Sequence, residues 1–237
     1  MRVVFLGTGE AFGSRANTCL LVNGELLLDC GPHALLQLRR LGAKLAEIRA
    51  VLISHLHGDH FLGIPALLLA CREDGRRDRL SILGPPGTEQ AIRELLRLSY
   101  RREVEGLGYE VEFLEPEKTE SLAGYRLEFC STLHGVDTLC VSIERRRKKL
   151  VYLCDGVPTE DCVALARGAN LLVAEAYAAG ARLHSSPERA ARIAAEAQAE
   201  MLALVHIYRG ISQEELRRAE QLFPGCFIPG ELEEVEV

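Results

Sequence analysis

The sequence predicts an α/β protein, a four-layer sandwich in which two packed, mixed β-sheets are flanked by helices. Two observations support this prediction. Each half of the chain opens with short apolar strands and continues with strands and helices in alternation, an order that puts helices on the outer faces of sheets. The 237 residues are 48% hydrophobic, which is enough to fill such a core. We therefore expect a single domain over residues 1–237, built from two similar halves of about 1–115 and 116–237.

The first half is predicted to begin with a strand at 3–6 and a hairpin of strands at 18–22 and 26–30. The dipeptide Asn23-Gly24 separates the hairpin strands and is the strongest short signal for a two-residue turn. A helix over 32–41 follows, because it begins with proline, which suits a first helical turn. The remaining elements expected here are strands at 50–54, 80–83 and 109–114 and helices at 65–71 and 89–99.

The second half is predicted to open with consecutive strands at 125–132, 138–144 and 150–154. Five cations at 145–149 join the last two strands, and such a run is typical of a solvated hairpin tip. Ser186 before Pro187 predicts a helix start, since serine caps helices and proline fits the first turn. The further elements expected are helices at 160–166, 187–200 and 213–222, strands at 171–175 and 201–205, and a final strand pair within 226–237.

The stretch with the clearest chemistry is His55-Leu56-His57-Gly58-Asp59-His60, which follows the apolar strand over 50–54. In open α/β sheets, ligands bind where strands end. His55 and His57 point the same way in an extended segment, and Gly58 lets the chain turn toward Asp59 and His60. Imidazole and carboxylate together suit zinc, manganese or iron. The alternative is a polar loop with incidental histidines. Four potential ligands within the six residues 55–60 argue against it.

Further histidines and one aspartate follow predicted strands or precede a helix. They are His134 after the strand at 125–132, Asp155 after 150–154, His206 after 201–205, and His184 in the loop before the helix at 187–200. We expect them to converge with the cluster on one sheet edge, which describes a two-metal site. His33, at a helix start, is assigned no role. Asp29 either supports a ligand or closes a turn.

The composition of the chain argues against some classes of function and against some cellular compartments. A formal net charge of −6 argues against a general nucleic-acid coat. No apolar tract is long enough to span a bilayer, and the chain enters a strand directly after Met1, so we expect a cytoplasmic protein. The eight cysteines include no Cys-x-x-Cys pair. The thiols that lie within or beside apolar strands are expected to pack as small hydrophobic groups: Cys30, Cys130, Cys140 and Cys154.

The residues of the 55–60 cluster, with His134, Asp155 and His206, resemble the metallo-β-lactamase superfamily over essentially the whole chain. Within that superfamily, the sequence looks most similar to the ribonuclease Z branch, a group of tRNA 3′ endonucleases. The segments that resemble this branch are Leu6-Gly7-Thr8-Gly9 with Arg15-Ala16-Asn17, Asp29-Cys30-Gly31, Gly63-Ile64-Pro65, Glu175-Ala176-Tyr177 and His184-Ser185-Ser186.

The resemblance implies a site for two divalent metal ions, with zinc first and manganese or iron as alternatives. One ion would be held by His55, His57 and His134, the second by Asp59, His60 and His206, with Asp155 bridging both. Ions roughly 3.5–4 Å apart would share a hydroxide that attacks a phosphodiester in line. Asp59 would orient that hydroxide, while His184, steadied by Glu175, would protonate the leaving oxygen as general acid.

The sequence also departs from the ribonuclease Z pattern. Those enzymes carry a long arm that grips tRNA, and between His134 and Asp155 there is no room for one. Ala174 stands where the branch often has histidine. The expected function is a phosphodiesterase that acts on RNA 3′ ends or on small or cyclic diesters. The pair His184 and Glu175 favours phosphate, because an alkoxide leaving group needs protonation more than a thiolate does.

Two alternatives stay open beside the phosphodiesterase. The first is hydrolysis of a carbonyl substrate, a thioester or a lactam, since related folds use the same metals for that chemistry. The second is a non-catalytic metal-binding interaction domain. We expect no membrane partner, and the oligomeric state is left open, with a homodimer as one option.

Overall fold

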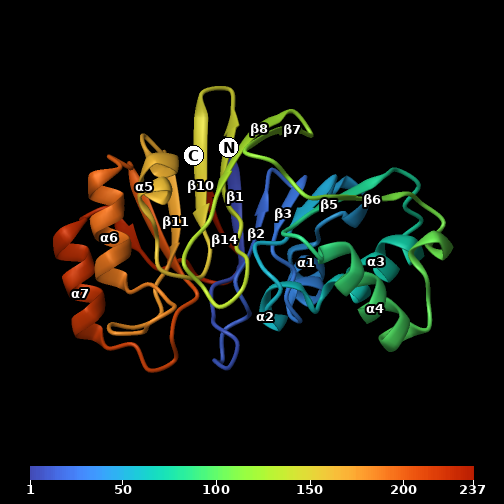
Figure 1. The fold of residues 1–237 in the computed structure, drawn as a ribbon, viewed down its shortest axis with the longest axis horizontal. Helices are drawn as coiled ribbons and strands as arrows, with labels where there is room; N and C mark the ends of the chain where they lie inside the picture. The colour runs from blue at the N-terminus through green and yellow to red at the C-terminus, as the bar shows by residue number, and fades with distance from the viewer.

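The computed structural model of the protein describes all residues, 1–237. Two seven-stranded sheets pack face to face in the middle of the molecule, and helices cover the outer face of each (Figure 1). Helices α1, α3 and α4 lie outside one sheet, and α5, α6 and α7 lie outside the other. The four-layer α/β sandwich predicted from the sequence is confirmed.

The first sheet holds the strands of the first half and one strand from the end of the chain. In spatial order these are β14 (Glu233–Glu236), β1 (Arg2–Gly7), β2 (Cys19–Val22), β3 (Leu26–Leu28), β4 (Ala50–Leu52), β5 (Leu80–Leu83) and β6 (Val111–Leu114). The second sheet runs β13 (Cys226–Phe227), β12 (Met201–Val205), β11 (Leu171–Glu175), β10 (Lys148–Leu153), β9 (Cys140–Arg145), β8 (Tyr125–Cys130) and β7 (Thr119–Leu122).

The helices follow the predicted alternation. They are α1 (Ala34–Leu41), α2 (Gly58–Phe61), α3 (Ile64–Glu73), α4 (Thr88–Tyr100), α5 (Glu160–Ala166), α6 (Pro187–Glu196) and α7 (Gln213–Leu222), with short 3-10 turns η1 (Leu45–Glu47) and η2 (Val104–Leu107). The expected cap of α6 is present, since the Ser186 side chain accepts a hydrogen bond from the backbone N–H of Arg189. No helix combines the length and the apolar character that a membrane crossing requires.

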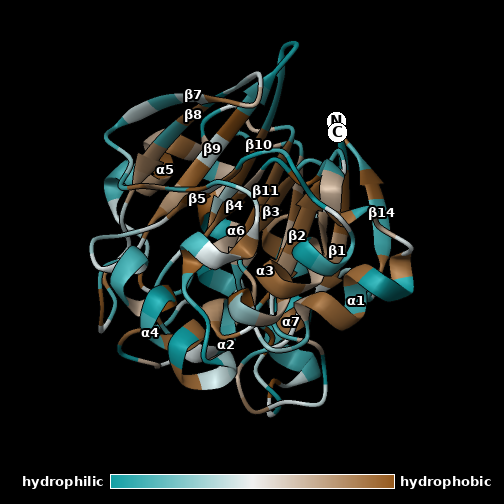
Figure 2. Cartoon of the chain, turned by 90° about the vertical axis from the view of Figure 1, so that its right-hand side faces the viewer, coloured by the Kyte–Doolittle hydropathy of each residue, from teal (hydrophilic) through white to brown (hydrophobic).

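Alternate side chains of β1 pack into two different apolar layers of the molecule. Val3 and Phe5 belong to the apolar cluster that fills the space between the sheets, whereas Val4 and Leu6 belong to the cluster under the first set of helices. This is the two-residue period of a strand whose two faces are both covered. Figure 2 shows the strands largely in the hydrophobic colour, with hydrophilic residues on the surrounding helices and loops.

Four sequence expectations need correction. The final strand pair within 226–237 is wrong, because β13 pairs with β12 in the second sheet and β14 pairs with β1 in the first. The turn at Gly58 is a short helix, α2, and strand β7 was not predicted. Helix α6 ends at Glu196, short of the expected 200, because Gln198 takes a left-handed backbone conformation (φ 55°) ahead of β12.

The two predicted hairpins are present. Asn23 and Gly24 both have positive φ, and Glu25 N donates to Val22 O, so they form the expected two-residue turn. The cationic tip at 145–149 joins β9 and β10 and projects from the body of the molecule at the top of Figure 1. Because β10 runs from Lys148 to Leu153, the tip includes the start of this strand and Asp155 lies beyond its other end.

Candidate metal centre

The predicted ligands meet at the ends of strands from both sheets, near α2. The first sheet contributes the 55–60 segment: His55 and His57 follow β4, and α2 carries Asp59 and His60. The second sheet contributes His134 after β8, Asp155 after β10, His184 after β11 and His206 after β12. The expectation that all would converge on one sheet edge is wrong, because the site is shared between the facing ends of two sheets.

Three imidazoles form the first group of potential ligands. His57 Nδ1 lies 3.1 Å from His55 Nε2 and 3.2 Å from His134 Nε2. Nitrogens that bind one tetrahedral zinc ion at about 2.05 Å lie about 3.3 Å apart, so these separations fit a shared metal. His134 Nδ1 donates to the carbonyl oxygen of Leu183 (2.7 Å), which leaves the Nε2 lone pair free to face the group.

A carboxylate and two imidazoles form the second group. Asp59 Oδ2 lies 3.2 Å from His206 Nε2 and 3.3 Å from His60 Nε2. His60 is fully buried, and its Nε2 has no hydrogen-bond partner within the protein. A buried nitrogen without a partner is costly, and a metal ion would satisfy it. The donor set of the two groups therefore fits two metal ions.

Asp155 lies between the two groups. Its Oδ2 is 3.0 Å from His206 Nε2, 3.6 Å from His60 Nε2 and 3.9 Å from His55 Nε2. Asp155 is 2% exposed, so its charge has no water to solvate it. One carboxylate oxygen thus faces histidines of both groups, which is the position that a bridging ligand requires.

Asp29 supports the second group from behind. His60 Nδ1 donates to Asp29 Oδ2 (2.8 Å), and the same oxygen accepts from the Tyr152 hydroxyl (2.7 Å) and from Ser54 Oγ (2.9 Å). The bond at Nδ1 turns the Nε2 of His60 toward the cluster. Asp29 and His206 both adopt positive φ, 59° and 51°, an uncommon conformation for residues other than glycine that collects at functional sites. The sequence left open whether Asp29 supports a ligand or closes a turn. Its hydrogen bond to His60 favours the supporting role.

A buried carboxylate connects the cluster to His184. Glu175 Oε1 accepts from His184 Nδ1 (2.5 Å) and lies 3.2 Å from His206 Nδ1, while Oε2 accepts from the backbone N–H of Gly156 and Ser185. Burial lowers the pKa of His184, but the hydrogen bond to Glu175 outweighs it and raises the pKa above its ordinary value. His184 is thereby held beside the metal ligands in a form that can carry a proton.

Protonation differs between the two groups in the metal-free protein. Burial lowers the pKa of His55 to about 2 and also lowers the pKa of His57, so these rings are neutral at pH 7. In the second group burial acts the same way, but the negative charge of Asp155 outweighs it. The pKa of His60 is raised well above its usual value, and that of His206 is raised to about 10.

The backbone around α2 is packed too tightly for a side chain at Gly31. A Cβ added there would lie 1.9 Å from the carbonyl oxygen of Asp59. Glycine at this position therefore lets the loop that follows β3 pack directly against α2, the helix that carries Asp59 and His60.

A cavity of about 560 Å³ opens over the cluster. Its lining residues are Glu10, Ala11, Phe12, Asn17, Pro32, His33, His57, Gly58, Asp59, Leu62, Asp155, Tyr177, His184 and His206. His33 has a place in this site after all, since its Nδ1 lies 2.6 Å from Asn17 Oδ1. Two further lining residues were assigned no role from the sequence: Glu10, and Tyr177, whose ring stacks on His184 at 4.4 Å. The strand-end rule applied to β1 would have pointed to the loop that holds Glu10 and Asn17.

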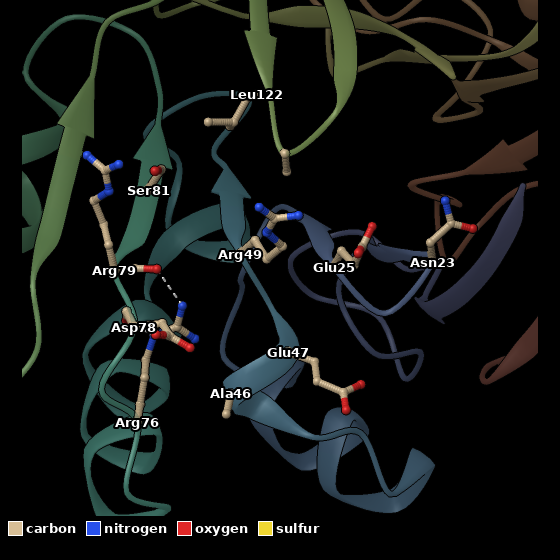
Figure 3. A pocket seen from close by; sticks show the side chains of 11 residues that line it. Asn23, Glu25, Ala46, Glu47, Arg49, Arg76, Asp78, Arg79, Ser81 and Leu122 are labelled. Carbon is tan, nitrogen blue, oxygen red and sulfur yellow. Dashed lines mark hydrogen bonds between the residues drawn. The ribbon is translucent and has the colours of Figure 1, made fainter. Parts of the chain in front are cut away.

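A second hollow, of about 690 Å³, lies next to the starts of β4 and β5, at the other end of the first sheet (Figure 3). Two of its arginines are already engaged: Arg76 donates to the carbonyl oxygens of Leu45 and Arg79, and Arg79 pairs with Glu112 at 3.0 Å. No histidine lines it. The candidate site is therefore at the histidine end of the sheets.

Known proteins share this architecture. Residues 25–207 match the beta-lactamase superfamily domain. A ribonuclease Z of Halorubrum lacusprofundi is 32% identical, over 100% of this chain and 97% of its own length. The human tRNase Z, short form, has a TM-score of 0.81 at 26% identity, covering 100% of this chain and 99% of that one. The metallo-beta-lactamase fold protein YhfI from Bacillus subtilis has a TM-score of 0.83 at 24% identity, covering 99% of each chain, and shows the same fold.

The match to the ribonuclease Z of H. lacusprofundi runs over 302 aligned positions, although this chain has 237 residues, so that relative carries segments that this chain lacks. The similarity nevertheless extends over the whole chain, and the buried His/Asp cluster is typical of a binuclear metal site of this fold. The chain therefore belongs to the metallo-β-lactamase superfamily, with full-length relatives named ribonuclease Z.

Proposed function

We propose that the protein is a metal-dependent phosphodiesterase of the ribonuclease Z type, which hydrolyses a phosphodiester bond near an RNA 3′ end or in a small or cyclic diester. The observation that carries this proposal is the contact of His184 with buried Glu175 beside the His/Asp cluster. A phosphodiester releases an alkoxide, which needs a proton from a positioned acid. The full-length relatives named ribonuclease Z support the same substrate class.

The proposed ligand assignment follows the two groups of facing atoms. His55, His57 and His134 hold one metal ion; Asp59, His60 and His206 hold the other; Asp155 serves both. The ions, when bound, activate water and offset the charge of the phosphodiester. Zinc suits this set of imidazole and carboxylate donors, and manganese and iron suit it as well.

The protein residues divide the proton transfers between them. Asp59 lines the cavity, where its carboxylate orients the attacking water. His184 keeps Nδ1 on Glu175, so its other ring nitrogen is the one that protonates the leaving oxygen. Glu175 cannot turn away, because its second oxygen accepts two backbone N–H groups. The acid is thus preorganised at the edge of the site.

The position of the cationic tip limits which part of an RNA the protein can hold. In this chain the tip at 145–149 and the site lie at opposite ends of β10, so the tip does not line the cavity. We therefore propose recognition at the scissile diester and its neighbouring nucleotides, without the grip on the body of a tRNA that the arm gives to ribonuclease Z enzymes.

A panel of substrates tests the proposal. Metal-loaded protein is given bis-p-nitrophenyl phosphate, an RNA with a 3′ extension, a thioester and a β-lactam, with metal-stripped protein as control. Diester hydrolysis should exceed the other two reactions by a wide margin, and the RNA should be cut at an internal bond. Robust thioester or lactam hydrolysis without diesterase activity would instead establish the carbonyl hydrolase. Bound metal with no turnover of any substrate would establish a non-catalytic metal-binding domain.

A further inference from the structure

A second set of metal-ligating side chains lies in the second sheet, where three thiols converge. Cys130 ends β8 and Cys140 begins β9, and the two are direct cross-strand partners in the antiparallel pair. Helix α5 packs over these strands and places Cys162 against them. The sequence predicted Cys130 and Cys140 as independent packing groups, because no spacing in the chain connects them to Cys162 on a later helix.

The three sulfur atoms lie close enough together to share one metal ion. The three Sγ atoms all lie within 4.8 Å of one another, and Cys130 Sγ is 3.6 Å from Cys162 Sγ. Thiolates that bind one tetrahedral zinc ion at about 2.3 Å lie about 3.8 Å apart. Cys154 is 3.5 Å from Cys140 but lies outside this group of three. The geometry is therefore that of three sulfur ligands.

The surroundings allow an ion to enter and leave room for a fourth ligand. Cys140 and Cys162 are buried, whereas Cys130 is half-buried and lines an open groove of about 870 Å³. Oxygen atoms stand beside the sulfur atoms: Thr159 Oγ1 is 3.4 Å and the carbonyl oxygen of Ser131 is 3.5 Å from Cys162 Sγ. A soft cation with three thiolates and an oxygen or water from the groove would be fully coordinated.

A thiolate ligand must lose its proton, and the three thiols differ in this respect, because hydrogen bonds among the cysteines together with burial raise the pKa of Cys130 and Cys140. Hydrogen bonds from Cys130 and Cys140 lower the pKa of Cys162, although burial opposes them. None of these residues lines the cavity over the His/Asp cluster, so the proposed reaction makes no use of them.

We propose that Cys130, Cys140 and Cys162 form a thiolate site for a soft cation of the Zn²⁺ class, separate from the two ions of the His/Asp cluster. The site is independent of the hydrolase reaction, because no ligand of that cluster is a sulfur atom.

Cobalt substitution tests this site directly. Thiolate bound to Co²⁺ gives an intense ultraviolet charge-transfer absorption, which imidazole and carboxylate ligands do not give. Full-length protein titrated with Co²⁺ should develop this absorption and bind one more ion per chain than Cys130→Ser or Cys162→Ser. The matched control is Cys226→Ser, which changes another half-buried cysteine, on β13, and should keep both the absorption and the extra ion.

Two outcomes overturn the proposal. Wild-type protein that fills the His/Asp cluster without any thiolate absorption would show that the thiols only pack, and an absorption that persists in both variants would place the sulfur ligands elsewhere. If Cys162→Ser fails to fold, Cys130→Ser still decides the question, because its thiol is half-exposed. Diesterase activity should be unchanged in Cys130→Ser, so failure here and failure of the proposed function are distinguishable.

Discussion

The two groups of potential metal ligands are close neighbours, but they are built differently. His55, His57 and His134 offer imidazole nitrogens alone, and two of these rings are only half-buried. Asp59, His60 and His206 include a carboxylate, and both of their histidines have a second carboxylate behind them, Asp29 or Glu175. The first group is therefore an open set of imidazoles, whereas the second includes a carboxylate and is supported by further carboxylates. The difference indicates that the two ions bind with different affinities and different dependence on pH.

The largest effect should come from removing the oxygen that faces both groups. Asp155→Ala should abolish diesterase activity and lower the number of ions bound at the His/Asp cluster from two to one or none, because each group loses a ligand atom within 4 Å. Metal analysis and the bis-p-nitrophenyl phosphate assay measure this. The control is Asp137→Ala, an exposed aspartate in the same half of the chain. Full activity or full metal content in Asp155→Ala would contradict the shared position.

His184 belongs to neither group, so its removal should separate catalysis from metal binding. His184→Ala should keep both ions and lose kcat by about 10²–10⁴-fold on diesters with poor alkoxide leaving groups. An activated p-nitrophenyl diester needs little protonation and should suffer far less. Equal losses on both substrates would mean that His184 positions the phosphate, and lost metal would make it a ligand.

The hydrogen bond from His60 to Asp29 should affect the affinity of only one ion, the one held by Asp59, His60 and His206. Asp29→Asn keeps the shape of a fully buried side chain but weakens the bond to His60 Nδ1 (2.8 Å). We expect the affinity for the second ion to fall by about 10–100-fold, with the first ion unaffected. Stepwise metal titration in competition with a chelator measures both affinities, and Asp74→Asn at the surface is the control. An equal loss at both positions would show that the groups act as one.

The smallest expected effect is on the pH dependence of metal binding, and it distinguishes the two groups most directly. In the metal-free protein the pKa of His206 is raised to about 10 and that of His60 is raised well above its ordinary value, so an ion must displace protons from these rings to bind. His55 and His57 have none to lose. Raising the pH from about 6.5 to about 7.5 should therefore tighten the binding of the second ion by about tenfold for each proton displaced, with a smaller change at the first ion, where His55 and His57 have no proton to release. The same titration at the two pH values measures this, and equal slopes would contradict the comparison.

Local patterns explain which parts of this molecule could be predicted from its sequence. The 55–60 segment is a contiguous motif, and β5, α5, β11, β12 and α7 have the predicted bounds because their periodicity is strong and their ends carry clear signals. Strand β7, of sequence Thr-Glu-Ser-Leu, lies at a sheet edge and has little apolar character to reveal it.

Features that depend on partners distant in the chain could not be predicted in this way. The separation of β13 from β14, the contact of Glu175 with His206 and the meeting of three cysteines all require knowing which strands become neighbours. Ligand roles assigned to single residues, the two-halves division near 115 and the cytoplasmic location stay predictions.

The pairing of β14 with β1 has a consequence for folding during synthesis of the chain. On the ribosome, β1 emerges before the other strands of its sheet, and its outer partner, residues 233–236, emerges after all of them. Throughout translation the growing chain therefore exposes the unpaired edge of a strand whose inner residues are almost entirely apolar, and such an edge invites pairing with other chains. A chaperone that covers residues 2–7 of the nascent chain would protect it until the last strand arrives.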